Sequence, residues 1–108
     1  MKKGNAYITD EDKTVELSNR IGNKEPAAIV EALRHGSYFC AVKAMIVCAK
    51  EGVKNADIVE AIKQLKDVDV EMVGNTVGEY AKATLHVMNE EKYTGDSPFV
   101  LGLIEAGV

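Results

Sequence analysis

Apolar residues recur at intervals of three and four positions along most of the chain, which is the spacing of helices with one buried face. No stretch alternates apolar and polar residues between turn signals, and no Asn-Gly or Asp-Gly pair marks a β-hairpin. The pattern therefore predicts an all-α protein. About six helices are expected, near residues 10–22, 26–35, 38–51, 56–65, 70–89 and 98–106.

Several of these helices carry the residues that usually begin or end one. Ser37 and Asn55 stand at N-cap positions, where a side-chain oxygen accepts a backbone hydrogen bond. Pro26 stands at a first helical position, where the missing amide has no intrahelical partner to lose. Gly52 follows the helix expected at residues 38–51, as is typical of a helix C-terminus. That helix is apolar almost all round, so we expect it to be central and buried.

The segment 70–89 allows two interpretations. Its apolar residues fit one long, bent helix, and the sequence favours this reading because an internal glycine costs only about 1 kcal/mol. The alternative is a break at Gly74-Asn75 followed by a new helix. Thr76 and Glu79 have the spacing of a capping box, which would begin that helix.

A short motif occurs twice. The stretch from Ile29 to Leu33 returns in nearly the same form from Ile58 to Ile62, about 30 residues later. The Glu within each copy keeps its position and is expected to face solvent. A longer, more apolar helix follows each copy, and residues 40–50 align with residues 72–82. The stretch from Pro98 to Leu103 is a third version of the short helix. Such self-similarity predicts helical hairpins that bury their apolar faces on one another.

This arrangement resembles the HEAT repeats of the armadillo/HEAT superfamily. The resemblance lies in the hairpin unit and in small residues of the inner helices, such as Ala41 and Ala81. It implies a HEAT-like α-solenoid fragment, a right-handed stack of antiparallel helical hairpins, in residues 25–108. Residues 1–24 would precede it as a flexible lead and a short helix within one domain. The family often has an Asp in the turn and an Arg early in the inner helix, and the first turn here, His35 to Ser37, has neither.

Composition and charge narrow the function classes. The net charge is −4, and acidic residues predominate from Asp67 onward, which argues against a general nucleic-acid binder. The longest apolar-rich stretch, residues 38–49, contains Lys43 and is too short to span a bilayer. Cys40 and Cys48 would lie about 12 Å apart along one helix, too far for a disulfide. Two buried thiols and no secretory signal lead us to expect a cytoplasmic protein with no membrane association.

No catalytic, metal or cofactor motif is present. His35 and His86 are the only histidines, and neither has a Cys or carboxylate at ligand spacing. We therefore expect no enzyme, no metal and no cofactor. Some HEAT-like proteins are enzymes, so a small enzyme is a remote alternative. It would need a ligand-sized pocket beside Tyr38 or Tyr80.

The most promising surface is the inner-helix face, where the resemblance implies that partners bind. Aligning the two inner helices predicts a strip of mixed charge, formed by Lys43, Lys50, Lys54, Asn75, Glu79, Lys82 and His86. We expect a non-enzymatic protein–protein interaction module, a regulator, inhibitor or adaptor, with an unknown protein partner. The alternative is a nucleic-acid-binding helical domain that uses Lys43, Lys50, Lys54, Lys63 and Lys66.

The helix expected at residues 98–106 suggests self-association. Its apolar residues point in nearly every direction, and no inner helix follows to cover them. We therefore expect it to pack in a two-fold homodimer or against a partner, and the interface would be formed by Phe99, Val100, Leu101 and Ile104. The alternative is that the N-terminal segment with Val15, Leu17 and Ile21 folds back over this helix.

Overall fold

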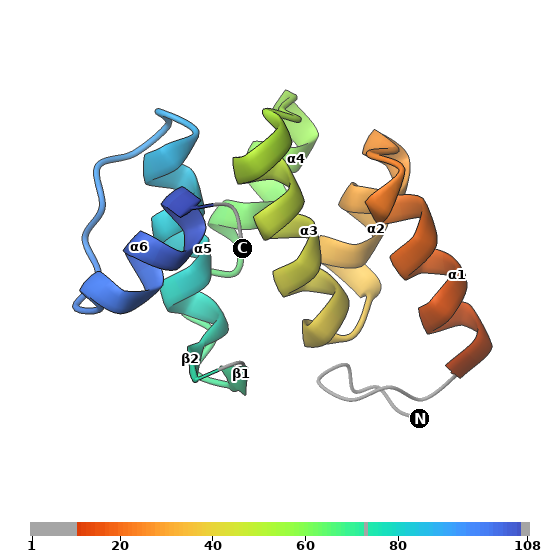
Figure 1. The fold of residues 1–108 in the computed structure, drawn as a ribbon, viewed down its shortest axis with the longest axis horizontal. Coiled ribbons are helices and arrows are strands. Elements are labelled where there is room, and N and C mark those ends of the chain that lie inside the picture. The colour runs from red at the N-terminus through yellow and green to blue at the C-terminus, as the bar shows by residue number, and fades with distance from the viewer. Residues whose placement is uncertain (1–10, 73, 107–108) are drawn as a thin grey trace.

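The computed structural model describes residues 11–72 and 74–106. Within these ranges the chain forms six helices and one small antiparallel sheet (Figure 1). The elements are α1 (Glu11–Gly22), α2 (Pro26–His35), α3 (Tyr38–Glu51), α4 (Ala56–Lys63), β1 (Glu71–Met72), β2 (Asn75–Thr76), α5 (Val77–Val87) and α6 (Pro98–Ala106). The mostly helical architecture is as the hydrophobic pattern predicts. The lead predicted at the N-terminus lies outside the described residues.

The predicted boundaries of α2 and α3 and the predicted start of α4 are confirmed, whereas α4 ends at Lys63, two residues before the predicted end. Local capping decides the starts of α3 and α4. The Ser37 hydroxyl oxygen accepts a hydrogen bond from the Cys40 amide at 3.2 Å, and Asn55 Oδ1 accepts one from the Ile58 amide at 2.8 Å. Gly52 ends α3 with a φ of 72°, a left-handed conformation that glycine adopts without steric cost.

The segment before α5 corrects the favoured sequence interpretation. A continuous helix over residues 70–89 is wrong, and so is the expectation that no strand forms. Gly74 has a φ of 87°, which is incompatible with a right-handed helix. The chain turns there, so that Glu71 pairs with Thr76 in a two-residue hairpin. Thr76 then caps α5 by accepting a hydrogen bond from the Glu79 amide at 3.2 Å, as the alternative interpretation predicts.

Two helical hairpins form the centre of the molecule. Helix α2 packs against α3, α4 packs against α5, α2 also contacts α4, and α3 contacts α5. The repeated motif explains this arrangement, since Ile29 and Ile58 are both fully buried while Glu31 and Glu60 are both exposed. The core is aliphatic, with Tyr80 as the largest fully buried side chain among the described residues.

The terminal helices depart from the predicted stack. Helix α6 packs mainly against α5 and α3, so it does not extend the layer formed by α2 and α4 as a third outer helix would. Helix α1 packs against α2 and α3 and buries Leu17 and Ile21 there. Figure 1 shows α1 and α6 at opposite ends of the molecule. The alternative that the segment containing Val15, Leu17 and Ile21 covers α6 is therefore wrong.

None of the helices in the described part of the chain has the length and apolarity needed to cross a membrane.

Candidate functional site: the outward face of α3

The residues predicted to form one strip on the inner helices face different parts of the molecule. Lys43 Nζ donates a hydrogen bond to Ser18 Oγ of α1 at 2.7 Å. Asn75 Nδ2, by contrast, donates one to Ser97 Oγ at 2.9 Å, in the turn that begins α6. Because α1 and α6 lie at opposite ends of the molecule, these contacts draw the two side chains apart (Figure 1).

Tyr93 engages most of the predicted residues on α5. Its hydroxyl donates a hydrogen bond to Glu79 Oε1 at 2.7 Å and accepts one from the Ser97 amide at 2.8 Å. The Tyr93 amide donates to His86 Nδ1 at 3.2 Å, and the two rings meet edge to face. Burial, followed by the hydrogen bond with Glu79, raises the pKa of Tyr93 to about 12. Glu79 and His86 therefore hold the segment after α5 in place.

The lysines around α4 form ion pairs with acidic side chains of the same chain. Lys54 pairs with Glu90 and also donates to the Met88 carbonyl oxygen at 3.0 Å. Lys66 Nζ lies 2.8 Å from Glu91 Oε1, and Lys63 Nζ lies 3.8 Å from Glu91 Oε2. The hydrogen bond with Lys66 is the main cause that lowers the pKa of Glu91. Three of the five bases named for nucleic-acid binding thus already have a carboxylate partner.

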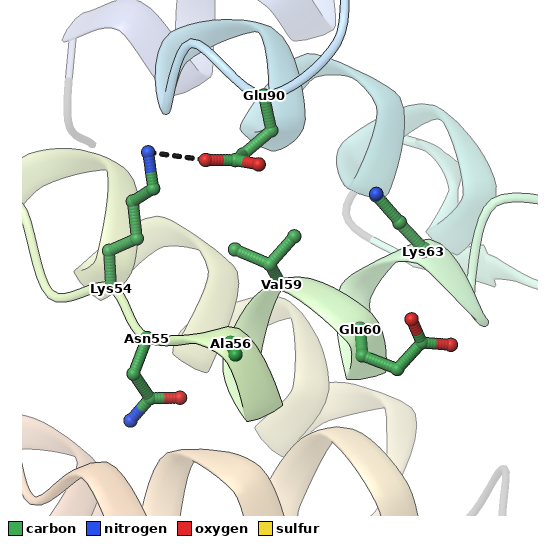
Figure 2. Close-up of a pocket in the computed structure, with 7 residues that line it drawn as sticks. All are labelled: Lys54, Asn55, Ala56, Val59, Glu60, Lys63 and Glu90. Atoms are coloured by element: carbon green, nitrogen blue, oxygen red, sulfur yellow. Dashed lines mark ion pairs between the residues drawn. The ribbon is translucent and has the colours of Figure 1, made fainter.

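Several of these charged side chains line open hollows, two of which are formed by described residues. Figure 2 shows the first, of about 500 Å³, in which Lys54 and Glu90 reach toward each other above Val59. The second, of about 370 Å³, is lined by polar side chains that include the Glu79–Lys82 ion pair, 3.5 Å between Oε2 and Nζ. Neither hollow is lined by Tyr38 or Tyr80, the positions where an enzyme pocket would be expected.

The outward face of α3 differs from these surfaces. Successive residues of a helix turn by about 100°, so Phe39, Lys43, Ile46 and Lys50 fall within about 60° of one another around the axis. We call these four residues the α3 stripe. Phe39 is 48% exposed, Lys50 is exposed, and the other two are half-buried. On the opposite side Ala41, Met45 and Cys48 are buried, so α3 is central as predicted but leaves one face accessible.

Among the residues that the structure describes, the two lysines of the α3 stripe have no carboxylate partner. Every other lysine or arginine whose side chain is described in residues 14–87 forms an ion pair with an acidic side chain. These residues are Arg20, Lys24, Arg34, Lys54, Lys63, Lys66 and Lys82. Lys43 Nζ donates its hydrogen bond to the neutral Ser18 hydroxyl, and among the described residues neither Lys43 nor Lys50 forms an ion pair. Outside the helices Lys92, in the loop before α6, is likewise without one.

Sequence reasoning identified Lys43 and Lys50 but missed Phe39 and Ile46. The signal available in the sequence was the spacing of the four stripe residues, which follow one another at intervals of four, three and four positions. It was obscured because an apolar residue in a largely apolar helix reads as core. In the described residues the large apolar side chains with most exposure are Val15 and Phe39, at 58% and 48%.

The surface predicted for self-association is reduced. Val100 and Ile104 are fully buried within the chain, on the face of α6 that packs against α5 and α3. Leu101 is half-buried, and the side chain of Phe99 lies outside the described part of the structure. Val100 and Ile104 therefore belong to the core of a single copy.

Comparison of the chain with protein-family models, with curated proteins and with solved structures finds no match.

Proposed function

We propose that this protein is a non-enzymatic interaction module that binds a protein partner through the α3 stripe. The observation that carries the proposal is that one helix face holds an exposed Phe and two lysines that form no ion pair within the described part of the chain. A partner that covers Phe39 removes apolar surface from water, at about 25 cal/mol per Å². A partner carboxylate beside Lys43 or Lys50 gains a charge pair without displacing an existing one.

The HEAT-like arrangement is part of the proposal. The repeated motif supports it, as do the contacts of α2 with α4 and of α3 with α5. In that arrangement α3 is an inner helix, which is the layer where the resemblance implies partner binding. The position of α6 across α3 and α5 limits the HEAT-like stack to two hairpins.

The free, buried state of both cysteines fits a reducing compartment such as the cytoplasm. Cys40 and Cys48 are both buried as free thiols. Burial raises the pKa of Cys48 to about 12, which keeps the thiol protonated and unreactive. The proposal therefore places the protein and its partner in the cytoplasm.

Self-association through α6 is a narrower proposal than the sequence suggested. Among the four residues predicted for the interface, Leu101 is the described side chain that is not fully buried. We propose that a two-fold dimer, if it forms through α6, has Leu101 in its interface. Light scattering at high micromolar concentration tests this proposal. A dimer that Leu101→Glu converts to monomer supports the idea, and a monomeric wild-type protein ends it.

Quantitative affinity capture tests the main proposal. Tagged wild-type protein, a Phe39→Ser/Lys50→Glu variant and a Lys92→Glu variant are compared on lysate from the source cells. Lys92 is the matched control, since it is an exposed lysine without an ion pair in the described residues but lies away from α3. We expect a set of proteins that the wild type and Lys92→Glu retain and the double variant loses. Equal recovery by all three would contradict the proposal.

A further inference from the structure

We infer that the segment bound by the α3 stripe is an acidic amphipathic helix of the partner, with two carboxylates about seven residues apart and an apolar residue between them. This inference rests on the proposed function, because it names the occupant of the same surface. It is carried by the order of side chains along α3 and by the charge that surrounds them.

The spacing of the lysines fits a helix. Lys43 and Lys50 are seven positions apart on α3, which is about 10.5 Å at 1.5 Å per residue. Two turns of a partner helix lying along α3 cover the same distance, so acids at positions i and i+7 lie opposite the two lysines. The Lys43 ammonium already donates to Ser18, but it carries three N–H donors and can also donate to a partner carboxylate. An extended segment rises about 3.3 Å per residue and would instead need acids about three residues apart.

The apolar members of the stripe fall in register with this pattern. Ile46 lies between the two lysines, and Phe39 lies one turn before Lys43. A partner helix therefore needs an apolar residue between its acids and another about one turn beyond one of them. Alternation of charge and apolar contact at helical spacing is what two packed helices use to fix their register.

The width of the exposed surface also favours one helix. Helix α3 contacts α1 on one side and α6 on the other, and in Figure 1 it lies between them. The α3 stripe is accordingly a single row of side chains. It matches the single row that one face of an amphipathic helix presents.

Charge selects an acidic partner over a basic or neutral one. The protein carries a net charge of −4, so its charge as a whole does not attract an acidic segment. On the described helices, the bases without a carboxylate partner are Lys43 and Lys50. An acidic helix thus meets locally unopposed positive charge on α3, which steers it to this face and sets its register.

A panel of helix-stabilised, fluorescein-labelled peptides tests the inference. The first peptide carries two Glu seven positions apart, with Leu between them and one turn beyond. The second has both Glu moved to the opposite face, and the third replaces both Glu by Lys. Fluorescence anisotropy measures binding to the wild-type protein and to its Lys50→Glu and Lys92→Glu variants.

We expect the first peptide to bind at least about tenfold more tightly than the other two, and Lys50→Glu to abolish that preference while Lys92→Glu preserves it. Equal affinity for all three peptides, a preference that Lys50→Glu leaves unchanged, or no binding at millimolar concentration would overturn the inference. A failed panel combined with capture that still depends on Phe39 and Lys50 refutes the acidic helix and retains the proposed function. Capture that is independent of the α3 stripe refutes the proposed function itself.

Discussion

The backbone amide of Tyr93 donates its hydrogen bond to Nδ1 of His86, at 3.2 Å. The bond joins the end of α5 to the loop that leads into α6, and the edge-to-face contact of the two rings lies beside it. The His86 ring can accept this bond only while Nδ1 is unprotonated. His86 is thus a structural acceptor that holds the 88–97 segment against α5.

Replacing His86 by Ala should therefore destabilise the protein. The Tyr93 amide loses its acceptor in a partly buried position, and we expect a loss of about 1 kcal/mol in the free energy of unfolding. Urea denaturation followed by circular dichroism measures it. His35→Ala is the control, because His35 is exposed at the end of α2. An equal effect of the two substitutions would show that the His86 contact contributes nothing.

Alkaline pH should weaken the same region through Tyr93. The pKa of its hydroxyl is raised from 10.0 to about 12 in the folded protein. A raised pKa means that this contribution to stability is complete below about pH 10 and is lost as pH rises toward 12. We expect Tyr93→Phe to lose less stability than wild type between pH 10 and pH 11. A parallel decline in both proteins would contradict this assignment.

Two helical glycines should respond in opposite directions to alanine. A Cβ at Gly78 would lie well inside contact distance of the Lys66 carbonyl oxygen, whereas a Cβ at Gly102 would meet nothing within 4 Å. We expect Gly78→Ala to destabilise the protein by roughly 1–3 kcal/mol through steric strain. Gly102→Ala should instead stabilise α6 by about 0.5–1 kcal/mol through its higher helix propensity. Urea denaturation measures both, and effects of the same sign would refute the packing at Gly78.

The nucleic-acid alternative is tested by a salt titration with duplex DNA. Acidic neighbours already pair with Lys54, Lys63 and Lys66, so we expect no binding at about 50 mM salt. Micromolar affinity that falls steeply with salt, and that Lys63→Gln weakens, would restore the alternative.

Local signals explain what the sequence predicted well. The caps at Ser37 and Asn55 act within three residues, so the starts of α3 and α4 could be predicted from the local sequence. The break before α5 could not be decided locally, since Gly74 is compatible with a kinked helix or a turn. The turn is accompanied by close packing of Gly78 on the Lys66 carbonyl, and this tertiary contact is not visible in the local sequence.

The candidate site was predicted in part for a similar reason. Lys43 and Lys50 share one helix face, which helical spacing alone establishes. Glu79 and His86 also share a helix, but Tyr93 engages both from a segment that reads as a polar loop. The spacing of apolar residues along the sequence does not predict such contacts between a helix and a later loop.

Site-specific photo-crosslinking tests the central claim most directly. A benzophenone amino acid replaces Phe39 on the α3 stripe in one variant and the exposed Glu60 of α4 in another, and both are irradiated in source cells. The account predicts a discrete crosslinked partner from position 39 that is absent from position 60 and disappears when Lys50→Glu is added. The same products from both positions, or a partner captured only from position 60, would contradict the claim that α3 is the binding surface.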